Sequence, residues 1–246
     1  MSTEIALVTG ASRGIGAATA RRLARDGYAV CVNYRHAREP AERVVAEIES
    51  GDGRAIAVQA DVSVEADVVG LFKKLDAEPG TLTVLVNNAG IAYPRCRVDE
   101  LGLDVLERVL DINVVGLVHC AQQAIRRMSS RHGGHGGSIV NISSGSAYIG
   151  NPGENVHYSM SKGAVNSFTI GLSQEVAGEG IRVNAVSPGL TRTDMPPTEK
   201  LRELGPRIPM GRVGEAEEIA EAVAWLVSPA ASYVAGANIR VAGGRP

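Results

Sequence analysis

The sequence predicts one doubly wound α/β domain, in which helices cover both faces of a mainly parallel sheet of seven strands. Short apolar runs alternate with helical segments along all 246 residues. Several of these runs are apolar throughout, which is typical of strands that are buried on both faces. Regular alternation of strands and helices favours parallel strands joined by right-handed crossovers. No linker divides the chain, so we expect residues 1–246 to form a single domain.

Apolar runs mark the strands, and apolar residues at helical spacing, such as Val44 and Ile48, mark the helices. The expected strands are 5–8, 28–33, 55–59, 82–86, 138–142, 182–186 and 238–241. The expected helices are 17–25, 40–50, 65–75, 103–110, 114–128, 158–177 and 216–227. Residues 191–211 contain four prolines and are expected to be irregular. A loop of that length is usually functional, and we interpret it as a substrate lid.

Charge and composition exclude several classes of partner. Lys and Arg number 25 and Asp and Glu 27, so no basic surplus favours nucleic acid or an anionic membrane. No apolar run is long enough to span a membrane and no secretory signal is recognisable, so a cytoplasmic protein is expected. Three widely spaced cysteines predict no disulfide framework. His132 and His135 lack a third ligand, so no metal site is predicted.

A glycine-rich turn follows the first expected strand and precedes a helix. Three glycines at such a turn let backbone amides approach a pyrophosphate, which the helix N-terminus also favours. The GxxxGxG spacing differs from GxGxxG, and no Lys-Ser/Thr follows as in a nucleoside-triphosphate loop. The residues of this turn expected to bind a cofactor are Gly10, Ser12, Arg13, Gly14, Ile15 and Gly16.

Further motifs follow in order, each at the end of an expected strand or on the next helix. They are TGASRGIG at 9–16, NNAG at 87–90, Asn113, Ser144, YSMSK at 158–162 and SPG at 187–189. Together they resemble the short-chain dehydrogenase/reductase family over essentially the whole chain. The resemblance implies a Rossmann-type fold and an enzyme that uses a nicotinamide cofactor. Within that family the chain is most similar to 3-oxoacyl-thioester reductases and sugar dehydrogenases.

Tyr158 is the expected proton donor or acceptor for hydride transfer at a carbonyl carbon. A free phenol titrates near pH ~10, so its pKa has to be lowered for this role. Lys162 lies four residues on, hence on the same helical face. Its ammonium, with the positive nicotinamide ring of the oxidised cofactor, is expected to bring the pKa of Tyr158 toward neutrality. The resemblance also implies that Lys162 bonds the nicotinamide ribose, that Ser144 polarises the substrate oxygen, and that Asn113 interrupts its helix and holds a water in a relay to Lys162.

The choice of catalytic serine stays open between Ser144 and its neighbours Ser143 and Ser146. Ser144 precedes Tyr158 by fourteen residues, one more than in many members of the family it resembles. Strand alternation places Ser143 and Ser144 on opposite faces, so only one of them can point at the substrate. We assign Ser144. His157 does not share a helical face with Tyr158 and is not assigned a role.

Other residues are implied as cofactor contacts by the same resemblance. Asp61, with the backbone of Val62, would contact adenine, although a helix cap or turn also explains an aspartate there. The residues expected to line the ribose and the nicotinamide are Asn88, Ala89, Gly90, Tyr158, Lys162, Pro188, Gly189, Thr191 and Thr193.

The end of the second strand favours NADP over NAD. Enzymes that use NAD usually place an acidic residue there for the ribose 2′-hydroxyl, and here Asn33, Tyr34 and Arg35 precede the first acid, Glu39. Arg35 offers a planar donor fork suited to a phosphate, with Arg13 as a second cation and Asn33 as a neutral donor. The alternative is that Arg13 and Arg35 are merely solvated surface residues and bind no phosphate.

The prediction is an enzyme that transfers a hydride between NADP(H) and a small carbonyl compound or secondary alcohol. A non-catalytic protein that senses nicotinamide is the alternative. A homotetramer is expected, because the helices carrying Asn113 and Tyr158 have more apolar residues than one sheet face can bury. Those apolar residues are Val114, Val115, Leu117, Val118, Ala164, Val165, Phe168 and Leu172. Segment 216–244, with Trp225, Leu226 and Tyr233, is the second expected interface.

Overall fold

A seven-stranded parallel sheet forms the centre of the molecule. The computed structural model describes residues 3–92 and 95–245. The strands are β1 (Glu4–Val8), β2 (Ala29–Tyr34), β3 (Arg54–Gln59), β4 (Thr81–Asn87), β5 (Gly137–Ile142), β6 (Ile181–Pro188) and β9 (Asn238–Val241). Their order is β3-β2-β1-β4-β5-β6-β9, and each neighbouring pair is parallel. The predicted doubly wound fold is therefore confirmed.

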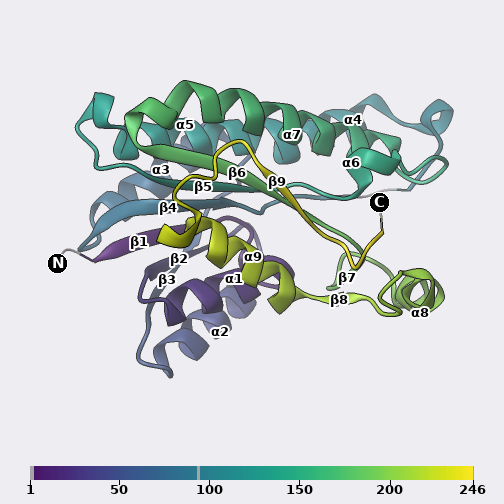
Figure 1. Cartoon of the computed structure of the whole chain (residues 1–246), viewed down its shortest axis with the longest axis horizontal. Coiled ribbons are helices and arrows are strands. Elements are labelled where there is room, and N and C mark those ends of the chain that lie inside the picture. The colour runs from purple at the N-terminus through teal and green to yellow at the C-terminus, as the bar shows by residue number, and fades with distance from the viewer. Residues whose placement is uncertain (1–2, 93–94, 246) are drawn as a thin grey trace.

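Helices cover both faces of the sheet (Figure 1). One face carries α1 (Gly14–Arg25), α2 (Arg38–Glu49) and α9 (Ala216–Val227); the other carries α3 (Glu65–Asp76), α4 (Leu103–Leu110), α5 (Gly116–Met128) and α7 (Val156–Val176). Strand β1 shows why both layers are needed. Its residues Ile5 and Leu7 enter one buried cluster, while Ala6 and Val8 enter the other. An apolar run without polar alternation is thus buried on both faces.

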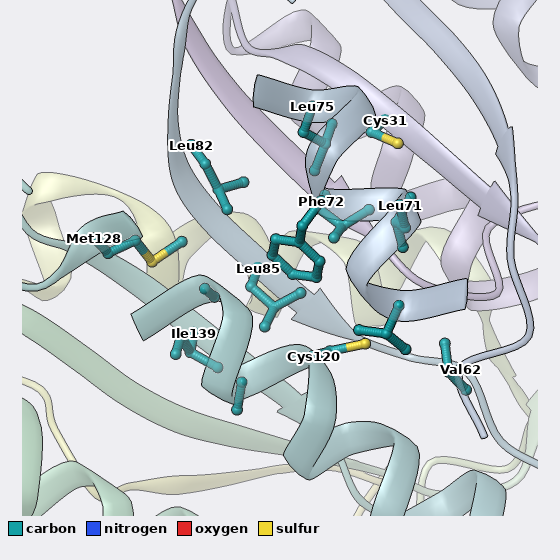
Figure 2. Packing of buried hydrophobic residues seen from close by; sticks show 14 of the residues in the cluster. Cys31, Val62, Leu71, Phe72, Leu75, Leu82, Leu85, Cys120, Met128 and Ile139 are labelled. Carbon is teal, nitrogen blue, oxygen red and sulfur yellow. The ribbon is translucent and has the colours of Figure 1, made fainter. Parts of the chain in front are cut away.

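The cluster beneath α3 and α5 is built around Phe72 (Figure 2). Phe72 is fully buried and packs near Leu85 and Cys120, which come from β4 and α5. Cys31 and Cys120 both belong to this cluster, and burial raises the pKa of each thiol, that of Cys120 to about 12. Both cysteines therefore serve as small apolar core residues.

Residues 191–211 differ from the irregular loop that the sequence predicts. Thr191–Arg192 form β7, which pairs with β8 (Gly214–Glu215), and Thr198–Leu204 form the short helix α8. The segment has its own small core, made of Leu190, Leu201, Ile208 and Val213. Four prolines therefore interrupt the segment without preventing local packing.

The apolar residues of which part are expected to meet another subunit differ in burial. Leu117, Val165, Leu172 and Leu226 are buried within this chain, and Val114, Val118, Ala164 and Phe168 are half-buried. Val115, Trp225 and Tyr233 are exposed. Among residues 3–92 and 95–245, no helix combines the length and the apolar composition needed to cross a membrane.

Candidate active site

The glycine turn lies where the strand order reverses, between β1 and β4. The carboxyl ends of these strands meet there, and open α/β sheets bind ligands at that point. Gly10 has a φ of +60°, and a Cβ at this position would lie 2.9 Å from the Cα of Ala89. A Cβ on Gly16 would lie 2.5 Å from Nδ2 of Asn88. The glycines therefore let the first turn pack directly against the segment that follows β4.

Three polar side chains fix the shape of the glycine turn. The hydroxyl of Thr9 accepts hydrogen bonds from the backbone amides of Asn88 and Ala89, each at 3.0 Å. The Asn88 side chain donates to the carbonyls of Thr9 and Gly10. Thr9 belongs to the motif at 9–16, but no role was predicted for it. Its position directly after a buried strand could have indicated this structural role.

Asn33 shapes the same turn from β2. Its Oδ1 accepts from the amide of Gly10 at 3.2 Å, and its Nδ2 donates to the carbonyls of Val58 and Ala60. Both amide hydrogens are thus used inside the protein. This corrects the expectation that Asn33 supplies a free donor to a phosphate. Tyr34, also expected at the cofactor, is buried and packs in the core beneath α1 and α2.

The N-terminus of α1 is available to an anion. Its first residue is Gly14, and within the described chain the preceding Arg13 makes no side-chain capping hydrogen bond. The first turn of this helix has no acidic side chain among its described residues. Arg13 is exposed and lies 3.7 Å from Asp194, and a Cβ on Gly14 would approach Thr193. The turn therefore contacts the beginning of the 191–211 segment.

A cleft at the same edge of the sheet contains the predicted reactive residues. Ser144, Tyr158 and Lys162, which we call the Tyr158 cluster, line it together. The other predicted residues that line the cleft are Ile15, Asn88, Gly90, Pro188, Gly189, Thr191 and Thr193. The structure thus brings these predicted residues together in one cleft, while Arg35, Asp61 and Val62 lie outside its lining.

In the protein alone the pKa of Tyr158 lies above its ordinary value, whereas the predicted lowering also includes the charge of the oxidised nicotinamide. Burial raises the pKa of Tyr158, and a hydrogen bond with the Ser144 side chain only partly offsets this. Lys162 Nζ lies 5.8 Å from the centre of the Tyr158 ring and donates to the carbonyl of Ile142 at 2.8 Å. Burial lowers the pKa of Lys162 to about 8. Burial is therefore the largest influence on both groups, raising the pKa of Tyr158 and lowering that of Lys162.

Asn113 interrupts its helix as the sequence resemblance implied. Residues Asp111–Val115 form a π-helical turn between α4 and α5, and Asn113 is buried within it. Its side chain accepts from the amide of Ile91 at 2.8 Å and donates to the carbonyl of Ile91 and to Ser161. A Cβ on Gly90 would lie 3.3 Å from Asn113 Oδ1 and 3.4 Å from Lys162 Nζ. Asn113 therefore holds the segment after β4 beside Lys162.

The three candidate serines have different contacts. Ser143 is buried and bonds to the carbonyl of Lys162 and, at 2.6 Å, to Oδ1 of Asn166. Ser144 lies 3.0 Å from the hydroxyl of Ser146 and interacts with Tyr158. Ser146 in turn accepts from Asn151. Ser144 is thus the serine joined to Tyr158, while Ser143 ties β5 to α7.

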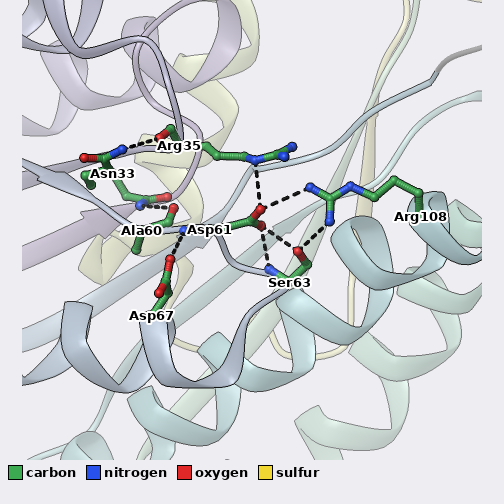
Figure 3. Close-up of polar contacts among 8 residues, drawn as sticks. Asn33, Arg35, Ala60, Asp61, Ser63, Asp67 and Arg108 are labelled. Carbon is green, nitrogen blue, oxygen red and sulfur yellow. Dashed lines mark hydrogen bonds and ion pairs between the residues drawn. The ribbon is translucent and has the colours of Figure 1, made fainter.

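A charged network lies at the ends of β2 and β3 (Figure 3). Asp61 accepts from Arg35 at 2.8 Å and from Arg108 at 3.1 Å, and Arg108 also donates to Ser63. We call Arg35, Asp61, Ser63 and Arg108 the Asp61 network. Burial opposes ionisation of Asp61, but hydrogen bonds from Ser63 and Arg108 and the charge of Arg35 hold its pKa below the ordinary value. Two cations thus surround one carboxylate, and Arg108 was not found from the sequence.

Val62 has a packing role beside this network. It is buried, and a Cβ on Gly116 would lie 2.8 Å from its Cγ2 and its carbonyl oxygen. Gly116, the first residue of α5, therefore allows the helix to pack closely on the end of β3. This contact fixes the backbone next to Asp61.

The residues of this edge fit a dinucleotide. The first turn of α1 offers unpaired amides for phosphate, Arg35 gives the ribose end a cation, and the Tyr158 cluster lies along the same edge. These donors and cations would suit the anionic groups of a dinucleotide, and a phenol beside a lysine would suit a proton donor.

Known proteins resemble this chain over almost its whole length. A family model described as enoyl-(acyl carrier protein) reductase matches residues 10–245. The uncharacterized oxidoreductase YgfF of Escherichia coli strain K12 is 47% identical over 245 residues, 98% of this chain and 99% of the relative. The 3-oxoacyl-(acyl-carrier-protein) reductase FabG of Staphylococcus aureus strain Mu50 is 40% identical over 249 residues, 98% of each chain.

Solved structures show the same fold. A short chain dehydrogenase from Burkholderia cenocepacia J2315, determined in complex with NADP, is 37% identical with a TM-score of 0.90, over 97% of this chain and 96% of that one. The fold, the glycine turn and the tyrosine–lysine pair define an oxidoreductase of the Rossmann class. The chain belongs to the short-chain dehydrogenase/reductase family.

Proposed function

We propose that this protein reduces a ketone to a secondary alcohol with NADPH, or catalyses the reverse reaction with NADP. The observation that carries the proposal is the Tyr158 cluster, which places a phenol, a serine hydroxyl and a buried lysine in one cleft beside the glycine turn. A protein that only sensed the cofactor would not need this set of groups. The overall reaction converts ketone, NADPH and one proton to alcohol and NADP.

The bound cofactor supplies the hydride that reaches the carbonyl carbon. Tyr158 gives its hydroxyl proton to the carbonyl oxygen as the C=O bond is reduced. Because burial raises its pKa, Tyr158 holds that proton at neutral pH, as a donor must. Ser144 hydrogen bonds to Tyr158 and would donate to the same substrate oxygen, which its position in the cleft supports.

Lys162 and Asn113 support proton supply to Tyr158. Burial brings the pKa of Lys162 to about 8, so it can gain and lose a proton near neutral pH. The Asn113 side chain forms hydrogen bonds with Ile91 and Ser161. The water that we assign to this residue would therefore bond to the backbone carbonyl of Asn113 in the π-helical turn. Pro188, Gly189, Thr191 and Thr193 would hold the nicotinamide.

The preference for NADPH rests on the Asp61 network. A 2′-phosphate would meet the guanidinium groups of Arg35 and Arg108 there, beside the carboxylates of Asp61 and Asp67. The structure from Burkholderia cenocepacia named above contains NADP, which supports the same cofactor for this chain. The expected homotetramer also remains a proposal, and the exposed Val115, Trp225 and Tyr233 support it.

The test is a screen of ketones in which oxidation of the reduced cofactor is monitored by its loss of absorbance. Diketones, acetoacetyl thioesters, keto sugars and simple oxo acids would each be offered with NADPH and with NADH. We expect turnover with at least one ketone and a kcat/KM at least about tenfold higher with NADPH. Absence of turnover with every ketone, while NADPH still binds, would favour a non-catalytic role. Equal or better efficiency with NADH would contradict the cofactor assignment.

A further inference from the structure

A group of cations lines the cleft without a role in hydride transfer. Arg95 follows β4, Lys200 lies on α8, and Arg245 follows β9, yet all three line the same cleft as Ser144 and Tyr158. No carboxylate is among the described residues that line it. Three separate parts of the chain therefore bring positive charge to the space where a substrate would lie.

The carboxylate of Glu154 lies close to these cations. It forms an ion pair with Lys200, and its pKa is lowered by Lys200 first, then by Arg95 and Arg245. In the described ranges of the chain, the side chains of Arg95 and Arg245 form no direct hydrogen bond or ion pair. One negative charge thus stands against three positive charges, which leaves binding capacity for a second anion.

Hydrogen bonds fix the chain beside two of these cations. The amide of Cys96 donates to the carbonyl of Glu154 at 2.8 Å, which fixes the residue after Arg95 beside the loop that leads to α7. A guanidinium nitrogen of Arg240 donates to the carbonyl of Arg245 at 2.8 Å. Like charges that are held near one another repel, so this arrangement is favourable mainly when an anion lies among them.

We propose that the substrate carries a carboxylate, which Arg95, Lys200 and Arg245 bind while the substrate carbonyl faces Ser144 and Tyr158. This inference rests on the proposed hydride transfer and narrows its substrate to small oxo acids or the matching hydroxy acids. A carboxylate suits these residues because its two oxygens accept the paired N–H groups of a guanidinium. The cations then act in binding and orientation and take no part in the chemical step.

Matched pairs of substrates test this directly. The oxo acids 4-oxopentanoate, 5-oxohexanoate and 6-oxoheptanoate would each be compared with their methyl esters, using NADPH and the whole protein. Each pair has the same ketone and differs only in charge at the far end. We expect at least one acid to exceed its ester about tenfold in kcat/KM, mainly through a lower KM. Added salt should raise KM for the acid and leave that of the ester unchanged, because screening acts on charge.

Variants identify the residues that act. Arg245→Gln and Arg95→Gln should each raise KM for the preferred acid about tenfold and leave the ester unaffected. Arg202→Gln is the control, because it makes the same substitution at an exposed arginine of α8 that does not line the cleft. Glu154→Gln should lower KM for the acid alone, since it removes the competing charge near Lys200.

The outcomes separate this inference from the proposed function. Esters and other neutral ketones that turn over as well as or better than every acid would overturn the carboxylate assignment and leave hydride transfer standing. The same holds if Arg245→Gln raises KM for acid and ester alike. Failure of every ketone, charged or neutral, would overturn the proposed function itself.

Discussion

The Asp61 network and the Tyr158 cluster handle charge in opposite ways. In the Asp61 network each cation contacts a carboxylate directly, at 2.8 Å from Arg35 and 3.1 Å from Arg108 (Figure 3). In the Tyr158 cluster no carboxylate lines the described part of the cleft, and burial sets the pKa values of Tyr158 and Lys162. The ion pairs of the Asp61 network fix the positions of its side chains, whereas burial in the Tyr158 cluster adjusts the proton affinity of Tyr158 and Lys162. The first region is therefore suited to cofactor selection and the second to proton transfer.

The largest expected effect is that of Tyr158→Phe. The phenyl ring keeps the packing and removes only the hydroxyl that transfers the proton, so kcat should fall at least about 10³-fold. Affinity for NADPH, measured by fluorescence titration, should stay within about threefold of wild type. Wild-type turnover by this variant would show that the Tyr158 cluster is not the reaction centre.

The two adjacent serines give the next largest contrast. Ser144→Ala should lower kcat about 10²-fold, because it removes a donor to the reacting oxygen and to Tyr158. Ser143→Ala is its control, because Ser143 bonds to Asn166 and to the carbonyl of Lys162. We expect Ser143→Ala to lower thermal stability and to change kcat much less. A reversed order would assign the reaction to Ser143.

The rates of the two reaction directions should depend oppositely on pH. Reduction needs protonated Tyr158 and oxidation needs its phenolate, and burial raises the pKa of this group. Reduction should therefore be constant through neutral pH and fall at alkaline pH. Oxidation should rise about tenfold per pH unit until the pKa is reached. An oxidation rate that no longer changes above about pH 6 would contradict a raised pKa.

The smallest expected effects concern the Asp61 network. Arg35→Ala should raise KM for NADPH about tenfold and leave KM for NADH nearly unchanged, because only NADPH carries the 2′-phosphate. Arg38→Ala, which breaks an exposed pair with Glu42, is the control. Arg108→Gln should raise KM for both cofactors about threefold, since it loosens Asp61 rather than removing the phosphate partner. Equal effects of Arg35→Ala on both cofactors would assign Arg35 to holding Asp61.

Most of the fold could be predicted because its signals are local. Strands that are apolar throughout and helices with apolar stripes gave the order of elements, and the helix 216–227 and the strand 238–241 have the predicted bounds. The short helix α8 was missed, because four prolines nearby indicate irregular structure while the packing of Leu201 against Val213 depends on residues distant in sequence. Local sequence signals do not contain that contact.

The geometry of the site could be predicted where it depends on residues within one motif. It could not be predicted where it depends on burial or on contacts between distant segments. Strand alternation separated Ser143 from Ser144, and the structure places only Ser144 against Tyr158. The raised pKa of Tyr158 in the protein alone could not be predicted, because spacing shows that Lys162 is near but does not show how completely the ring is buried. The hydrogen bonds from Asn33 to the end of β3 and the ion pair of Arg108 with Asp61 likewise depend on contacts between distant segments.

The division between the two regions is tested most directly by the double variant Arg35→Ala/Ser144→Ala, measured as kcat/KM with NADPH beside each single variant. The two sites share no partner, so their free-energy effects should add and the losses should multiply to about 10³-fold. Arg35→Ala should reduce kcat/KM by raising KM for NADPH, whereas Ser144→Ala should reduce it by lowering kcat. A double variant no worse than the poorer single variant would contradict a division between cofactor selection and proton transfer.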